Sequence, residues 1–155
     1  MPHIARETYR DLMDRQATVK PAKKISPQKI SIPVSEIKLT IPALQKTLNK
    51  LLRIHWTQFQ KEQKIFDILI HKAYIESYPN GENFRSRKVK ITYTLYFRDG
   101  KKRDLSNYGQ KMIDDSLVRE GIINDDNSNV VVEESVRIRK DKASPRTEVE
   151  ITGAD

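Results

Sequence analysis

The stretch RKVKITYTLYFRDGKKRDLSNYGQKMIDDSLVREGIINDDNSN, residues 87–129, carries most of the information about the fold. Its first part alternates apolar and polar residues over 89–97, and a two-residue period is typical of a strand with one face on a core. Its second part has the period of a helix, which Asp104 or Ser106 would cap and Gly121 would end. The stretch therefore predicts a strand, then a helix, then an acidic loop.

Three further strands and one long helix are predicted around this stretch. Runs at 35–42, 129–139 and 146–152 have the composition and period of strands. Residues 57–75 carry apolar side chains at helical spacing, and we expect the following ones to face the core: Phe59, Ile65, Phe66, Leu69 and Ile70. The predicted fold class is α+β, a single mixed αβ domain of about four strands with two main helices packed on the sheet.

The first 35 residues differ in composition from the rest of the chain. Prolines at positions 21, 27 and 33 stand among lysines, and proline removes backbone donors and restricts its neighbours. We expect a basic, flexible N-terminal extension over 1–35 and the folded domain over 36–155. A disordered leader and an arm that lies along DNA are both compatible with this composition.

The chain is strongly basic, with a formal charge of +8 and an isoelectric point of about 9.6. This balance favours polyanionic partners, nucleic acid first and an anionic membrane surface second. The sequence has no cysteine, which excludes disulfides and cysteine-based metal sites or catalysis. No apolar run approaches the ~20 residues that span a bilayer, and no signal-peptide core is visible, so we expect a soluble intracellular protein without membrane partners.

Acidic residues gather directly behind the densest basic run of the chain. Asp104 opens the predicted helix, Asp115 lies further along it, and Asp125 and Asp126 follow its end. If these carboxylates converge, their repulsion must be offset, and Mg²⁺ typically takes one or two carboxylates plus substrate phosphate. Lys111, four residues before Asp115, would pair with it along the helix. The same residues could instead be a helix cap, a solvent-facing ion pair and an Asx-rich turn.

The motif resembles the signature of RusA-type Holliday junction resolvases, which are small phage-associated endonucleases. That signature is a basic run leading into Asp-Leu-Asp-Asn, a lysine, a helix that ends in glycine, a hydrophobic pair and Asp-Asp. Its parts in this sequence are RDLSN at 103–107, Lys111, DSL at 115–117, GII at 121–123 and DD at 125–126.

The resemblance covers about 36–152. The segment IPALQKTLNKLLRIHW at 41–56 is similar to the family's basic loop after the first strand, so we expect 47–56 to form a DNA-facing loop rather than a helix. The order of elements from residue 35 onward also matches the family's mixed αβ fold.

The resemblance implies a metal-dependent endodeoxyribonuclease, with Mg²⁺ or Mn²⁺ as cofactor, that cuts four-way Holliday junctions or other branched DNA. It further implies a homodimer at work in the cytoplasm of a bacterial host. Asp104 and Asp126 match metal-binding carboxylates, with Asp125 and Asp115 in support. Lys111 matches a lysine that is needed for cleavage.

Basic residues near the motif are expected to contact the DNA backbone. Arg103 matches a DNA-contacting arginine of the family, and lysines on the polar face of the 89–97 strand run on into the motif. The residues expected to bind DNA are Lys50, Arg53, Lys88, Lys90, Lys101, Lys102 and Arg103. Trp56, in the basic loop, could stack on a base or pack inward to anchor the loop.

Two departures from the family pattern leave alternatives open. Ser106 stands where family members carry a second carboxylate, and one extra residue separates Asn107 from Lys111. A neutral hydroxyl is a weaker metal ligand, so Ser106 could mark a non-catalytic protein that binds branched or duplex DNA. An RNA-binding protein with an acidic turn is the third interpretation.

Overall fold

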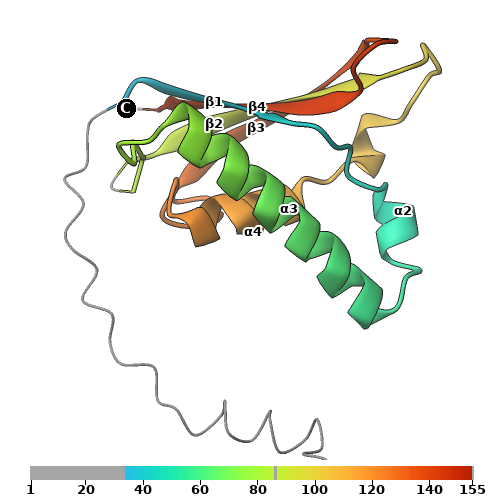
Figure 1. Cartoon of the computed structure of the whole chain (residues 1–155), viewed down its shortest axis with the longest axis horizontal. Coiled ribbons are helices and arrows are strands. Elements are labelled where there is room, and N and C mark those ends of the chain that lie inside the picture. The colour runs from blue at the N-terminus through green and yellow to red at the C-terminus, as the bar shows by residue number, and fades with distance from the viewer. Residues whose placement is uncertain (1–33, 86, 155) are drawn as a thin grey trace, which may run out of the picture.

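The computed structural model describes residues 34–85 and 87–154, so nearly all of the predicted N-terminal extension lies outside the described residues. The described chain forms one four-stranded sheet with helices on one of its faces (Figure 1). The elements in chain order are β1 (Glu36–Ile41), α2 (Leu48–Leu51), α3 (Trp56–Ser77), β2 (Val89–Phe97), the 3-10 helix η1 (Leu105–Asn107), α4 (Lys111–Glu120), β3 (Val131–Lys140) and β4 (Arg146–Gly153).

The strand order in the sheet is β1-β4-β2-β3. β4 is antiparallel to both of its neighbours, whereas β3 pairs with β2 in parallel. The chain reaches β3 from β2 through η1 and α4, because two parallel strands need a long connection. At the centre, Tyr93 of β2 lies opposite Val136 of β3 and Val149 of β4. The predicted α+β class, with four strands and two main helices, is confirmed.

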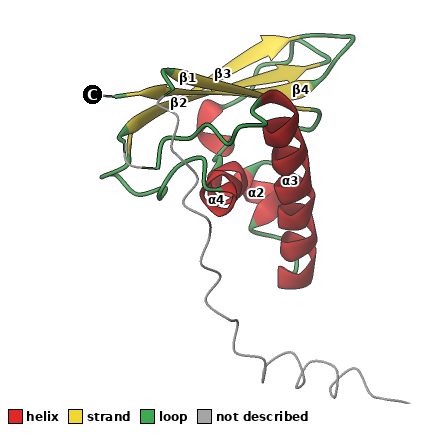
Figure 2. Cartoon of the chain, turned by 60° about the vertical axis from the view of Figure 1, so that its left-hand side comes forward, coloured by secondary structure: helices red, strands yellow, loops and turns green. Residues whose placement is uncertain are grey.

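The hydrophobic core lies between the sheet and helices α3 and α4 (Figure 2). Phe66 and Ile70 of α3 and Leu117 of α4 pack onto it. Alternate residues of β1 and β2 point inward, as their two-residue period predicts, and are almost fully buried: Ile37, Leu39, Ile41, Val89, Ile91, Tyr93 and Leu95. The other face of the sheet carries no helix in the described chain, and its side chains are polar.

One polar contact is built into this core. The hydroxyl of Tyr93 donates a hydrogen bond to Oδ1 of Asp114, which lies on the inner side of α4 and is only 7% exposed. Burial raises the pKa of the Asp114 carboxyl from 3.8 to about 7. Burial and the neighbouring carboxyl also raise the pKa of the Tyr93 hydroxyl.

Helix α3 is longer than predicted, and four of the five residues expected to face the core pack on it, namely Phe59, Phe66, Leu69 and Ile70. Its buried side chains are Gln63, Phe66, Ile70 and Tyr74, which follow one another at helical spacing. Ile65 is 50% exposed, so its predicted place in the core is wrong, because it lies about 100° around the helix from Phe66.

No helix in the described part of the chain is both long enough and apolar enough to cross a membrane.

The segment 47–56 is not entirely loop. Thr47 caps the single-turn helix α2, and its side-chain oxygen accepts a hydrogen bond from the backbone N–H of Lys50. The expectation of a loop is therefore wrong for residues 48–51, where the threonine cap and two leucines favour a turn of helix. The remaining residues up to His55 form a turn that leads into α3.

The helix predicted after β2 is divided into two pieces. Asp104 caps only the short η1, and α4 begins anew at Lys111, so one continuous helix from residue 104 or 106 is wrong. Two residues from an earlier segment of the chain stabilise the break between η1 and α4. The side-chain amide of Gln45 donates a hydrogen bond to the Gly109 carbonyl, and the Leu48 side chain occupies the space that a side chain on Gly109 would need. Asp104 and Asp115 therefore do not share a helix face.

The predicted end of α4 at Gly121 is confirmed. Gly121 has φ +72°, in the left-handed region, and its N–H bonds to the carbonyl of Val118. Nε of Arg85 donates to the Gly121 carbonyl at 3.0 Å, and the guanidinium occupies the space that a side chain on Gly121 would need. The next residue, Ile122, accepts a hydrogen bond from the N–H of Phe84 at 2.7 Å. These contacts turn the chain back toward the sheet.

We expect Gly121→Ala to lower the free energy of unfolding by about 1–3 kcal/mol, because the new side chain is strained at positive φ and collides with Arg85. Gly100→Ala is the matched control: Gly100 does not have a positive φ, and the nearest atom to its added Cβ is Cδ of Lys140 at 3.7 Å. Urea denaturation measures both. Equal losses in the two variants would contradict this account of Gly121.

The buried Asp114 predicts a pH dependence of stability. Its folded pKa of about 7 lies above its ordinary value of 3.8, so folding favours the protonated form and this contribution is lost as pH rises from about 4 to about 7. Asp114→Asn stays neutral, so its stability relative to the wild type should rise over this interval by on the order of 3 kcal/mol.

Asp141→Asn provides a control of opposite sign. The Arg146 side chain lowers the pKa of Asp141, so this carboxylate stabilises the fold at higher pH and the variant should lose stability relative to the wild type as pH rises. Denaturation at several pH values measures both slopes. A flat difference for Asp114→Asn would show that the carboxyl titrates normally in the fold.

Candidate active site

Lys111 gathers two carboxylates at the start of α4. Its Nζ lies 2.7 Å from Oδ1 of Asp115, one turn along the helix, and 2.6 Å from Oδ2 of Asp126, in the loop after α4. The two ion pairs raise the pKa of Lys111 well above its usual range, and the lysine lowers the pKa of Asp126. The Lys111 side chain remains 63% exposed. The group is therefore held in place by its partners yet open to a ligand.

Asp126 reaches this position through the turn at Gly121. The loop at 124–130 folds over the start of α4, and the Asp126 N–H bonds to Oδ1 of Asp125 at 2.7 Å. Both carboxyl groups are half-buried. The structure thus brings together three residues that the sequence singled out, Lys111, Asp115 and Asp126, with Asp125 beside them.

Two carboxyl groups next to this cluster were not singled out from the sequence. Glu134 of β3 lies on the helix-covered face of the sheet, and both desolvation and the charge of Asp126 raise its pKa. A hydrogen bond with the buried Asp114 opposes that rise. The sequence could have predicted the buried position of Asp114, because this residue lies on the apolar side of the predicted helix, three residues before Leu117. A buried tyrosine such as Tyr93 usually has a hydrogen-bond partner for its hydroxyl, which was a second signal for a polar group in the core.

Asp104 takes the role of a helix cap. Its Oδ1 accepts hydrogen bonds from the Ser106 backbone N–H at 3.0 Å and from the Ser106 hydroxyl at 2.8 Å. Both residues are exposed, and the η1 helix that they open lies against β3. The hydroxyl of Ser106 is therefore engaged with Asp104 itself.

Arg103 is fixed against the sheet. Its guanidinium lies 3.8 Å from the centre of the Phe97 ring, and one of its nitrogens donates to Asp99 at 2.7 Å. Only 16% of its side chain is exposed, and it lowers the pKa of Asp99. Arg103 thus joins the end of β2 to the start of η1, while the neighbouring Lys101 and Lys102 are exposed.

The other basic residues are not all on one surface. Lys50 and Arg53 are exposed in and after α2, on the helix side of the molecule. Lys90 points to the helix-free face of the sheet and pairs with Glu133 at 3.1 Å. Lys88, just before β2, is exposed. The sheet therefore separates Lys90 from Lys111 and its carboxylates.

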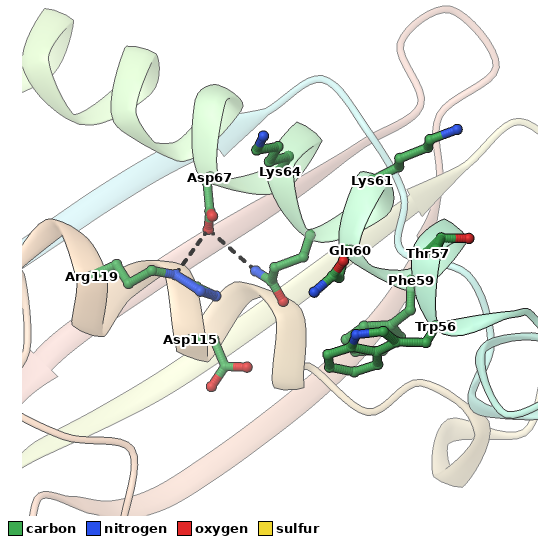
Figure 3. Close-up of a pocket in the computed structure, with 10 residues that line it drawn as sticks. Trp56, Thr57, Phe59, Gln60, Lys61, Lys64, Asp67, Asp115 and Arg119 are labelled. Atoms are coloured by element: carbon green, nitrogen blue, oxygen red, sulfur yellow. Dashed lines mark hydrogen bonds and ion pairs between the residues drawn. The ribbon is translucent and has the colours of Figure 1, made fainter. Parts of the chain in front are cut away.

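A hollow of about 740 Å³ adjoins Asp115 (Figure 3). The first turns of α3 form one side of it, with Trp56 and Phe59 at one end, and α4 contributes Asp115 and Arg119. Arg119 is paired with Asp67 across the hollow at 3.4 Å. The hollow gives a ligand room beside the carboxylates.

The carboxylate oxygens of the cluster are ligands of the kind that hard cations prefer, although the protein groups do not complete a metal site by themselves. In the described ranges, no three or more acidic, histidine or cysteine side chains are arranged to hold a metal ion. The Lys111 ammonium instead lies between Asp115 and Asp126. Mg²⁺ needs only one or two protein carboxylates when phosphate and water supply the rest, so the donor set fits it by kind.

Comparison with known proteins agrees with the geometry. A search of curated proteins finds no significant match to the chain. The family model described as Endodeoxyribonuclease RusA matches residues 42–152. That match begins just after β1 and includes α2, α3, the whole Lys111 cluster and nearly all of β4. Because it spans well over half of the sequence, the chain belongs to the RusA family of Holliday junction endodeoxyribonucleases.

Proposed function

We propose that the chain is a Mg²⁺-dependent endonuclease, with Mn²⁺ as the alternative ion, that cuts four-way or other branched DNA by phosphodiester hydrolysis. One observation carries this proposal. Lys111, Asp115 and Asp126 converge on an exposed surface inside the segment that matches the endonuclease family. The net charge of +8 would draw DNA toward the protein.

In this proposal, Asp104 and Asp126 are the principal metal ligands, with Asp125 and Asp115 in support. Two observations support the pairing. The η1 helix, which Asp104 caps, lies against β3, and the charge of Asp126 raises the pKa of Glu134 on β3. The ion would supply activation of water and neutralisation of charge at the phosphate. DNA phosphate and water would complete its coordination.

Lys111 is proposed to stabilise charge on the reacting phosphate. Its raised pKa keeps it cationic throughout the neutral range, so it is suited to electrostatic stabilisation and not to proton abstraction. Asp115 and Asp126 would hold the ammonium less strongly if they also held a cation. The exposed Nζ would then be available to the phosphate and its leaving oxygen.

The exposed cations Lys50, Arg53, Lys101 and Lys102 are proposed to bind the DNA backbone. Arg103, whose guanidinium is fixed over Phe97, would position this basic corner. A homodimer is proposed as the active form, because a four-way junction presents two symmetry-related strands and each protomer carries one Lys111 cluster. The separated position of Lys90 makes it a weaker candidate for the same DNA surface.

We expect Asp126→Asn to reduce cleavage of a synthetic four-way junction in Mg²⁺ by at least about a hundred-fold, because it removes a ligand charge and a partner of Lys111. Junction binding should persist, since no cation is lost. Glu36→Gln, the same chemical change at the far edge of the sheet on β1, is the control and should cut normally. Normal cleavage by Asp126→Asn would refute the proposed site.

A second candidate function is binding of branched DNA without cleavage. The favouring observation is that Asp104 accepts two hydrogen bonds from Ser106, which is the behaviour of a structural cap. In that case Ser106 would stand where a metal-binding carboxylate has been lost, and the basic surface would still bind a DNA junction.

The substitution Ser106→Asp separates the two functions. In a competent nuclease it should leave the cleavage rate within the same order of magnitude, whereas in a binding module it should create cutting that the wild type lacks. Ser144→Asp, which adds the same charge in the exposed β3–β4 turn, controls for general repulsion of DNA. Gel assays of junction cleavage and junction binding on the same preparations give both readouts.

A further inference from the structure

We propose that Trp56 and Phe59 form a stacking platform for an unpaired DNA base beside the scissile phosphate. The inference rests on the proposed function and adds a substrate requirement to it: the DNA must present an opened base at the cut. It is carried by the geometry of the two rings, by their position next to Lys111 and by the charges around them.

The two rings are already stacked on one another. Their centroids are 5.6 Å apart and their planes differ by only 8°. Trp56 is nevertheless 63% exposed, so it is not packed inward as an anchor for the loop. Phe59 is half-buried and supports it from one side. An exposed tryptophan ring with a supporting ring beneath it offers a flat surface of the kind on which bases stack.

The platform is held at the start of α3. His55 caps the helix, and its Nδ1 accepts a hydrogen bond from the N–H of Thr57 at 3.2 Å, so the backbone on both sides of Trp56 is fixed. Stacking on a preformed surface costs little ordering entropy. The ring is therefore prepared for a ligand before the ligand arrives.

Two hollows meet at the platform, and each extends to the proposed active site. The larger one, of about 740 Å³, runs from Trp56 and Phe59 to Asp115 (Figure 3). The second, of about 390 Å³, is lined by the same two aromatic residues, by Lys111 and otherwise by apolar side chains of α2, of the turn after it and of α4. A base on the platform would thus be joined by its own backbone to a phosphate near Lys111.

The charges around the platform favour a nucleic acid over an apolar protein partner. Lys61, Lys64 and Arg119 line the larger hollow, against two acidic residues. Figure 3 shows Lys61 and Lys64 extending from α3 on the side away from Asp115 and the two aromatic rings. Proteins that bind unpaired strands combine cations with aromatic side chains on which bases stack.

The chain contains a single tryptophan, so its fluorescence reports on Trp56 directly. The test uses the full chain in EDTA, with four-way junctions that carry 2-aminopurine at the crossover and with oligo-dT. We expect both DNAs to quench Trp56 and binding to change the 2-aminopurine signal. Trp56→Ala should abolish the 2-aminopurine change and weaken junction binding by roughly ten-fold or more, and Trp56→Phe should recover part of both.

Ile68→Ala is the matched control, because Ile68 is a large apolar residue on α3 that is 65% exposed and lies outside both hollows. It should behave as the wild type. The proposal is overturned if saturating DNA leaves Trp56 fluorescence unchanged, or if Trp56→Ala retains the 2-aminopurine change. It is also overturned if Trp56→Ala alters only the protein's mass in light scattering, which would assign the platform to self-association.

The outcomes also separate this inference from the proposed nuclease activity. A protein that quenches on DNA and never cuts it would refute the nuclease and leave the platform standing. Asp126→Asn should keep the 2-aminopurine change while losing cleavage. A wild type that cuts junctions, together with a Trp56→Ala variant that cuts and binds equally well, would refute the platform alone.

Discussion

The left-handed turn at Gly121 is the constraint on which the rest of the site depends. It ends α4, and the hydrogen bonds from Arg85 and Phe84 to the turn fix the direction in which the chain leaves. The same turn sends the following loop back across the start of α4 and then delivers β3 parallel to β2. Without it, Asp126 would not meet Lys111, and the edge strand that carries Glu134 would not lie beside Tyr93.

The site combines two kinds of carboxylate within a basic protein. Asp115 and Asp126 are exposed enough to exchange partners and are held by Lys111, whereas Asp114 is buried behind them and its pKa is raised by that burial. An outer pair that stays charged attracts cations, and an inner group that is easily protonated adds little repulsion. This division, together with the Lys111 ammonium, lowers the mutual repulsion of the carboxyl groups that gather here.

Much of the fold could be predicted from the sequence, because local periodicity decides it. The two-residue period of β2, the glycine after α4 and the helical spacing of Phe66 and Ile70 each depend on neighbours along the chain. The division between η1 and α4 could not be predicted, since Gln45 and Leu48 impose it from far away in the sequence. The candidate site was partly predictable for a similar reason, because the Lys111–Asp115 pair follows from helical spacing. The inward position of Asp114 and the hydrogen bonds between Ser106 and Asp104 could not be predicted, since they depend on tertiary packing.

The gap between η1 and α4 has a consequence for how the chain tolerates insertions and deletions. In an unbroken helix, every inserted residue would rotate all later side chains by about 100° and would carry the lysine away from its carboxylates. Here residues 108–110 form an irregular joint, so a change of length is absorbed before the helix starts. The extra residue expected from the resemblance to the family signature, between Asn107 and Lys111, would fall within this joint. A change of length there would leave the orientation of the Lys111 cluster unchanged.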